Sequence, residues 1–128
     1  MSYFDRALAI YPQQQQQETW NNKGIAFYKL GEYKQAIATF DVALKANVNI
    51  YGQTLYSYPD ASMTDYNKAL ALLRLGQHDH DISDIHLALK TVDEALHYNS
   101  DYKRAQDLRM TLKDILAWDN GPGGDGEG

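Results

Sequence analysis

The side chains that could do chemistry are concentrated in one short stretch. His78-Asp79-His80-Asp81 alternates imidazole and carboxylate groups, and a further carboxylate follows at Asp84. Imidazole nitrogens and carboxylate oxygens are common ligands of divalent metal ions. One hypothesis is therefore a metal-dependent hydrolase that uses the cluster at residues 78–81.

The same residues also suit a turn between two helices. Carboxylates stabilise a helix when they lie at its N-terminus, where the helix dipole is positive. A hydrolase would need further ligands from distant helices, and the sequence shows no matching set of His and Asp elsewhere. We therefore expect a polar capping turn, and we predict no metal, no cofactor and no catalytic residue.

Composition narrows the remaining classes of function. The chain has 128 residues, of which 44% are hydrophobic, and this is enough for the core of one compact domain. Its net charge is -5, with 12 basic side chains dispersed among 17 acidic ones, which argues against a nucleic-acid surface. The sequence has no cysteine, no membrane-spanning run and no secretory signal, so we expect a soluble, cytoplasmic protein that does not bind membranes.

An internal repeat indicates the helices that carry the candidate residues. A large apolar residue followed by Ala three positions later and Leu four positions later recurs at 4–8, 40–44 and 92–96. Spacings of three and four place side chains on one face of a helix. The sequence therefore predicts three related helices, separated by insertions of different length.

The middle copy resembles a tetratricopeptide repeat. In this family small residues allow two antiparallel helices to approach closely, and aromatic residues fill the space around the contact. Gly24 and Ala36 are the small residues here, and Gly31 suits the turn between the helices. The matching residues are Trp20, Gly24, Phe27, Ala36, Phe40, Ala43 and Leu44, whereas Lys23 and Val48 stand where the family has Leu and Pro.

The resemblance implies an all-α fold, a right-handed α-solenoid of antiparallel helix pairs with about six helices. We expect one helical domain over residues 1–118 and a flexible, acidic, Gly-rich tail over 119–128. The expected parts of the domain are a half repeat (3–12), a repeat (17–49), an insertion-bearing repeat (62–100) and a capping helix (101–118), with the glutamines at 13–17 as a linker.

A first insertion, at residues 50–60, is rich in tyrosine. Tyr51, Tyr56 and Tyr58 offer rigid aromatic rings of the kind that is enriched at protein interfaces. These rings either contact a partner or cover the groove between neighbouring repeats.

A second insertion separates the two helices of the later repeat. If Leu75-Gly76 corresponds to Leu30-Gly31, the next helix contact follows Gly76 by twelve residues, at Ala88, rather than by five. The seven extra residues either lengthen a helix by about two turns or form an irregular turn.

A surface for a partner follows from the implied architecture. The first helices of successive repeats line a concave face that can hold a peptide or a partner helix, although the same positions suit an ordinary solvated face. Asparagine amides can pair with a peptide backbone, and Lys29 and Arg74 would attract a carboxylate. The predicted peptide-binding residues are Asn21, Asn22, Ile25, Tyr28, Lys29, Tyr66, Asn67, Leu70, Leu73 and Arg74.

The carboxylate clamp with which some members of this family hold the C-terminal tail of heat-shock chaperones is only partly present. Asn22 matches the central asparagine of the clamp by its position, whereas Met63 and Asn67 stand where the clamp has Lys and Arg. We therefore do not expect this chain to bind that tail.

The leading hypothesis on function is a non-enzymatic scaffold whose partner is a protein or a peptide. The alternative is a homodimer. The half repeat at 3–12 lacks a first helix of its own, so its apolar residues would stay exposed unless a second chain covered them.

Overall fold

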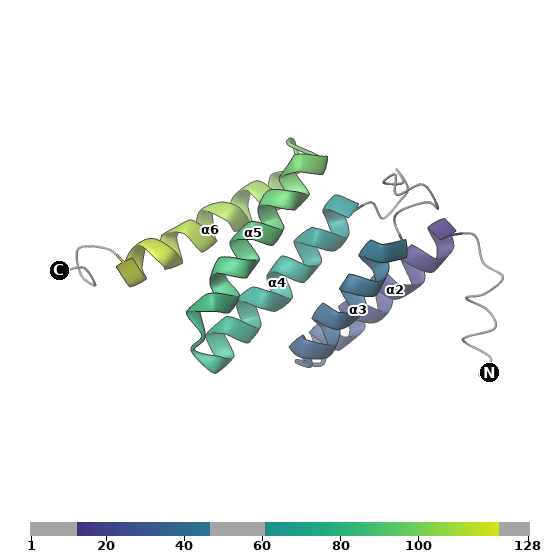
Figure 1. Ribbon diagram of the computed structural model, residues 1–128, viewed down its shortest axis with the longest axis horizontal. Coiled ribbons are helices and arrows are strands. Elements are labelled where there is room, and N and C mark those ends of the chain that lie inside the picture. Colours follow the sequence, from purple (N-terminus) through teal and green to yellow (C-terminus); the bar gives the residue numbers. More distant parts are fainter. Residues whose placement is uncertain (1–12, 47–60, 121–128) are drawn as a thin grey trace.

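The computed structural model describes residues 13–46 and 61–120, which form five α-helices and no strand (Figure 1). The helices are α2 (Gln13–Lys29), α3 (Tyr33–Ala46), α4 (Ala61–Asp79), α5 (Ile82–Tyr98) and α6 (Lys103–Asn120). The predicted all-α class is confirmed for these residues. The expected half repeat at 3–12 and the Tyr-rich insertion at 50–60 lie outside the described residues.

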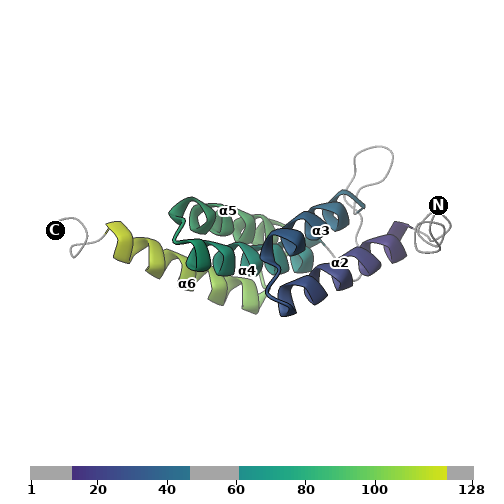
Figure 2. The ribbon, with the colours of Figure 1, turned by 90° about the horizontal axis from the view of Figure 1, so that it is seen from below.

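The five helices are arranged in two layers. Figure 2 shows α2, α4 and α6 along one side of the molecule and α3 and α5 along the other. Each helix packs against the next in the chain, and α4 also contacts both α2 and α6. This is a stack of helix pairs, as predicted, while the right-handed sense of the solenoid stays a prediction. We call the surface of α2, α4 and α6 that is turned away from α3 and α5 the inner face.

A close helix contact forms the first pair. Gly24 of α2 lies against the ring of Phe40, which is fully buried in α3 beside the equally buried Ala36. A side chain at Gly24 would occupy the space that the ring fills, so the small residue is what allows the two helices to approach. The predicted packing role of Gly24 is confirmed.

The turn of the first pair is built on Gly31. Its φ of 80° is a left-handed conformation that glycine adopts at little cost. The N–H of Gly31 donates to the carbonyl oxygen of Tyr28 at 3.0 Å, and the N–H of Glu32 donates to that of Phe27 at 2.9 Å. These two hydrogen bonds form a Schellman motif and satisfy the last carbonyl groups of α2.

The second pair turns at a different residue from the one expected. Gly76 does not end its helix, because α4 continues to Asp79 and the left-handed residue is His80, with φ of 55°. Gly76 is buried inside the pair, where a Cβ would lie 2.7 Å from the Cδ1 atom of Ile85. The expected correspondence between Gly76 and Gly31 is therefore wrong, since Gly76 provides a helix contact and not a turn.

The extra residues of the second pair lengthen both of its helices. In the first helices of the two pairs, the fully buried Ala69 takes the place of Gly24. The small residue and the left-handed turn residue enclose residues 24–31 in the first pair and residues 69–80 in the second. From the turn to the large contact residue, the spans are 31–40 and 80–92. The differences of four and three residues are each about one helical turn, so both packing faces stay in phase. Of the two interpretations of the insertion, the longer helix is the one observed.

The core consists of two clusters, and one half-buried residue packs against both. One cluster joins Ala36 and Phe40 of α3 to Ala71 of α4, and the larger one fills the space between α4, α5 and α6. Ile37 packs against both clusters, so the hydrophobic contact continues from the first pair to the second. An ion pair between Lys68 Nζ and Asp41 Oδ1, 2.7 Å apart, also connects α3 with α4.

Two expected boundaries differ from the structure. Residues 13–17 are not a linker, because α2 begins at Gln13 and the side chain of Gln17 is fully buried. Glutamine is a good helix former, and no Gly or Pro separates these residues from Trp20, so the helix extends over them. α6 runs from Lys103 to Asn120, so the first two residues of the expected tail belong to this helix.

Candidate functional site

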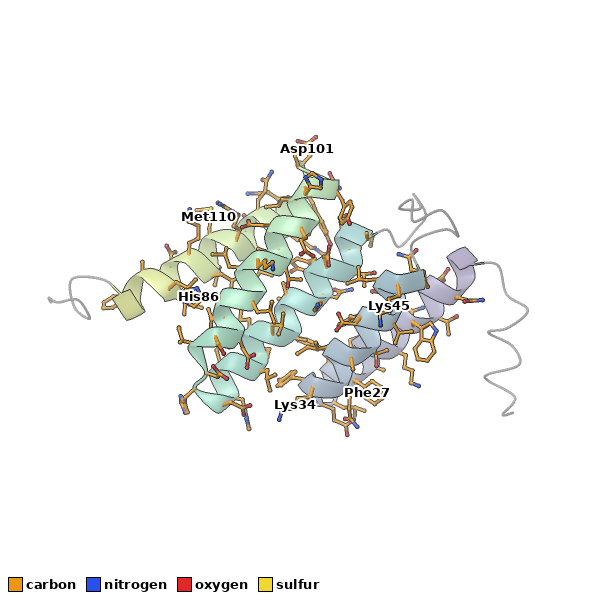
Figure 3. All side chains as sticks on the ribbon, in the orientation of Figure 1. Phe27, Lys34, Lys45, His86, Asp101 and Met110 are labelled. Atoms are coloured by element: carbon orange, nitrogen blue, oxygen red, sulfur yellow. The ribbon has the colours of Figure 1, made fainter. Side chains whose placement is uncertain are left out.

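A hollow on the inner face brings side chains from three helices together. Its volume is about 220 Å³, and a second hollow of about 300 Å³ adjoins it, sharing Met63, Tyr102 and Arg104. Both are lined by Tyr102 and Arg104 and so lie close to the start of α6, near Asp101, which is labelled in Figure 3. The residues that line the first hollow are Glu18, Asn21, Asn22, Ile25, Met63, Asn67, Tyr102 and Arg104.

Four predicted peptide-binding residues meet at this hollow. Asn22 is exposed, Ile25 and Asn67 are half-buried, and Asn21 is buried at its base. The three accessible residues offer two amide groups and one apolar side chain to a ligand. The structure brings this part of the predicted surface together at one hollow.

Asn21 has a structural role. Its side chain is only 4% exposed, and its Oδ1 accepts hydrogen bonds from Thr64 Oγ1 at 3.2 Å and from Asn67 Nδ2 at 3.3 Å. These bonds tie α2 to α4 under the hollow. Because the carbonyl oxygen is already occupied and covered, we correct the expectation that Asn21 binds a peptide directly.

Tyr28 and Arg74 form a second link between the same helices. Arg74 Nε donates to Tyr28 Oη at 3.2 Å, and Arg74 Nη1 donates to Gln77 Oε1 at 3.3 Å. The hydrogen bond with Tyr28 raises the pKa of Arg74, so the guanidinium stays charged. Neither residue lines the hollow, and Arg74 would bind a carboxylate only with the donors that these bonds leave.

The remaining predicted residues differ in their exposure. Leu73 is 4% exposed and belongs to the core between α4, α5 and α6, so the expectation that it contacts a peptide is wrong. Leu70 packs against the same core, and Tyr66 lies 5.4 Å from Tyr102, centroid to centroid. Partial burial raises the pKa of Tyr66, which keeps its hydroxyl neutral. Lys29 is exposed at the end of α2.

Sequence reasoning missed four residues of the hollow, namely Glu18, Met63, Tyr102 and Arg104. Glu18 and Met63 each lie four positions before a predicted residue, Asn22 and Asn67, and so continue the same helix faces by one turn. That periodicity could have identified both. Tyr102 and Arg104 belong to the start of α6, whose place beside α4 depends on tertiary packing.

The His-Asp cluster spans the end of α4, with His78 and Asp79, and the turn to α5, with His80 and Asp81. Asp81 Oδ1 accepts hydrogen bonds from the N–H of Ser83 at 3.0 Å and from its hydroxyl at 2.5 Å, and these bonds lower the pKa of Asp81. His78 Nδ1 lies 2.8 Å from Asp79 Oδ1, and both side chains are exposed. Partial burial, followed by the neighbouring carboxylates, raises the pKa of Asp84. The predicted capping interpretation is therefore confirmed for Asp81.

A further hollow lies beside this cluster. Its volume is about 510 Å³, and it lies between the turn after α2 and the end of α4, where His78 and Asp79 are among the residues that line it. Within residues 13–46 and 61–120, no three His, Asp or Glu side chains are grouped so that they could hold a metal ion. Tyr51, Tyr56 and Tyr58, the other candidate contact residues, lie outside these ranges.

Comparison with known proteins agrees with this architecture. Residues 17–49 match a family model described as tetratricopeptide repeat. The predicted resemblance is confirmed over these residues, which form a tetratricopeptide repeat. Searches of curated proteins and of solved structures found no match. None of the helices in the described part of the chain has the length and apolar character needed to cross a membrane.

Proposed function

We propose that this chain is a protein-interaction module that holds an extended segment of a partner protein against its inner face. Tetratricopeptide repeats typically act as non-enzymatic binding modules and present such a surface with the first helices of their repeats. The observation that carries the proposal is the hollow to which α2, α4 and the start of α6 all contribute side chains. A segment bound there would contact three helices at once.

The lining of the hollow suits a peptide. The amides of Asn22 and Asn67 can donate to and accept from a peptide backbone, which itself carries both kinds of group. Ile25, Met63 and Tyr102 also line the hollow and add apolar surface. Methionine is flexible and tyrosine combines an apolar ring with a hydroxyl, so both are well suited to contact a partner.

The dimensions of the two hollows are sufficient for part of a peptide segment. The two hollows, of about 220 and 300 Å³, adjoin each other at Met63, Tyr102 and Arg104, which line both. Together they reach the size of pockets that hold small organic ligands, which is enough for a few side chains of a peptide. Two adjoining hollows can accept successive side chains of one segment.

Selection from a displayed library of random peptides tests this proposal. The full chain is immobilised, enriched peptides are synthesised, and their affinity is measured for the wild type and for Asn22→Arg, which places a large side chain in the hollow. We expect binding to weaken at least tenfold, since the peptide would be displaced. The control is His86→Arg on α5, an exposed residue of the other layer, labelled in Figure 3.

The affinities of the two variants decide whether the inner face is the peptide site. Binding that Asn22→Arg abolishes and His86→Arg leaves unchanged supports the inner face as the peptide site. A library that yields no binder, or binders that are indifferent to Asn22→Arg, contradicts the proposal.

A further inference from the structure

Two opposite charges line the hollow without pairing. Glu18 comes from α2 and Arg104 from the first turn of α6, and both side chains are exposed. Among the described residues, neither forms an ion pair or a hydrogen bond. Although both line one hollow of about 220 Å³, their charged groups do not approach each other within ion-pair distance.

Two carboxylates lie three positions from Arg104: Asp101 precedes α6, and Asp107, within the helix, already has a basic partner. Lys103, beside Arg104, pairs with Asp107 one turn later, with Nζ 2.9 Å from Oδ1. Asp107 is also the acidic residue three positions after Arg104, so the carboxylate nearest along the helix is already engaged. Arg109, the next arginine of α6, pairs with Asp93 of α5 at 2.7 Å.

Glu18 has no basic partner within reach along its own helix. The residues three and four positions later are Asn21 and Asn22, and those three and four positions earlier are glutamines. Side chains at these spacings are the ones that can meet on a helix surface. The carboxylate of Glu18 is therefore available at the α2 side of the hollow, opposite the guanidinium of Arg104.

We propose, on the basis of the function proposed above, that the hollow selects a partner segment of mixed charge. A basic side chain of the segment lies against Glu18 and an acidic one against Arg104, while Asn22 and Asn67 bind the backbone between them. The two charges also fix the direction in which the segment crosses from α2 to α6. This recognition differs from that of a purely cationic clamp, because Glu18 would repel a second carboxylate of the bound segment.

Repulsion supplies much of the selectivity. A uniformly acidic segment would place a carboxylate beside Glu18, and a uniformly basic one would place a cation beside Arg104. Like charges that are brought together at an interface weaken binding strongly, whereas opposite charges attract. If the charges of both the protein and the peptide are reversed, an attractive pair is restored, and the recovered affinity measures the interaction. A charge exchange across the interface is therefore the sharpest test.

The test uses the full chain and the peptides selected from the random library. Affinities are measured by fluorescence anisotropy for the wild type, Glu18→Lys, Arg104→Glu and the double variant. Each peptide is compared with a version in which its acidic and basic residues are exchanged. Asp114→Lys on α6 and Lys90→Glu on α5 are the controls, since they reverse exposed charges that lie away from both hollows.

We expect the selected peptides to contain both signs of charge and each single reversal to weaken binding about tenfold or more, with the controls unchanged. The double variant should prefer the charge-exchanged peptide. Peptides that are uniformly acidic, or affinities indifferent to Glu18→Lys, would overturn this inference and leave the proposed function in place. A library without any binder would overturn the proposed function and this inference together.

Discussion

A Cβ atom at Gly24 would lie 2.5 Å from Cε1 of Phe40, closer than such atoms approach in folded proteins. Phe40 is fully buried, so its ring has little room to move away. The contact therefore fixes both the identity of the small residue and the distance between α2 and α3.

Gly24→Leu should lower the free energy of unfolding by about 1–3 kcal/mol, because the added side chain overpacks this contact. Chemical denaturation followed by circular dichroism measures the change. The matched control is Ala38→Leu, a small-to-large change at an exposed position of α3, for which we expect a change within about 0.5 kcal/mol. Equal stability of Gly24→Leu and the wild type would show that the two helices do not pack through this contact.

Asn21→Ala should destabilise the protein by about 1–3 kcal/mol, since the buried hydroxyl of Thr64 and the amide of Asn67 lose their acceptor. Asn22→Ala, one residue later but exposed, should change the unfolding free energy by less than about 0.5 kcal/mol. Thermal or denaturant unfolding of the two variants compares them directly. The assignment of Asn21 to structure and Asn22 to binding fails if their effects on stability are reversed.

Asp65 should make stability depend on pH. It is 1% exposed, its Oδ1 has no hydrogen-bond partner in the described part of the chain, and it lies near Glu94, Lys68 and Asp41. Burial, followed by the charge of Glu94, raises its pKa from 3.8 to about 7. Between these values the folded state retains a proton that the unfolded state has released, so the unfolding free energy falls as pH rises through this window.

Asp65→Asn should remove this dependence. A pKa change from 3.8 to about 7 corresponds to on the order of 4 kcal/mol, which is an upper value because the surroundings relax. We expect the variant to be more stable than the wild type at pH 8 and similar to it near pH 4, measured by urea unfolding in a series of buffers. Asp114→Asn on the exposed face of α6 is the control. A wild type whose stability rises from pH 5 to pH 8, with no gain from Asp65→Asn at pH 8, would contradict the assignment.

Single substitutions at the two left-handed residues, Gly31 and His80, test where the two helical hairpins turn. Gly31→Ala should destabilise the protein by about 1 kcal/mol, because alanine is strained at φ of 80° although nothing crowds its side chain. His80→Gly should cause no comparable loss, since glycine accepts φ of 55° without strain. Denaturant midpoints of the two variants provide the comparison, and a loss confined to His80→Gly would place the turns elsewhere.

The first helix pair could be predicted from sequence because its local signals agree with its packing. Gly24, Gly31 and Phe40 each have a type that their environment requires. In the second pair the local signal was misleading: Leu75-Gly76 repeats Leu30-Gly31, but the helix continues and Gly76 packs against Ile85. The N-cap at Asp81 was the better marker of the turn, and its role depends on Ser83, two residues later.

The site could be predicted only in part, because it depends on tertiary contacts. Asn21 and Asn22 are identical in type and adjacent, and only the position of α4 determines that the first is buried and the second exposed. Arg104 could not be assigned to the inner face without the packing of α6 beside α4. Leu73, predicted to face a peptide, is buried by the same packing.

Amide chemical shifts of the ¹⁵N-labelled chain, recorded with and without the tightest selected peptide, locate the bound segment directly. We expect the largest changes at Asn22, Ile25, Asn67 and Arg104, which line the hollow of the inner face. Changes confined to α3 and α5, or their absence at saturating peptide, would contradict binding at this face.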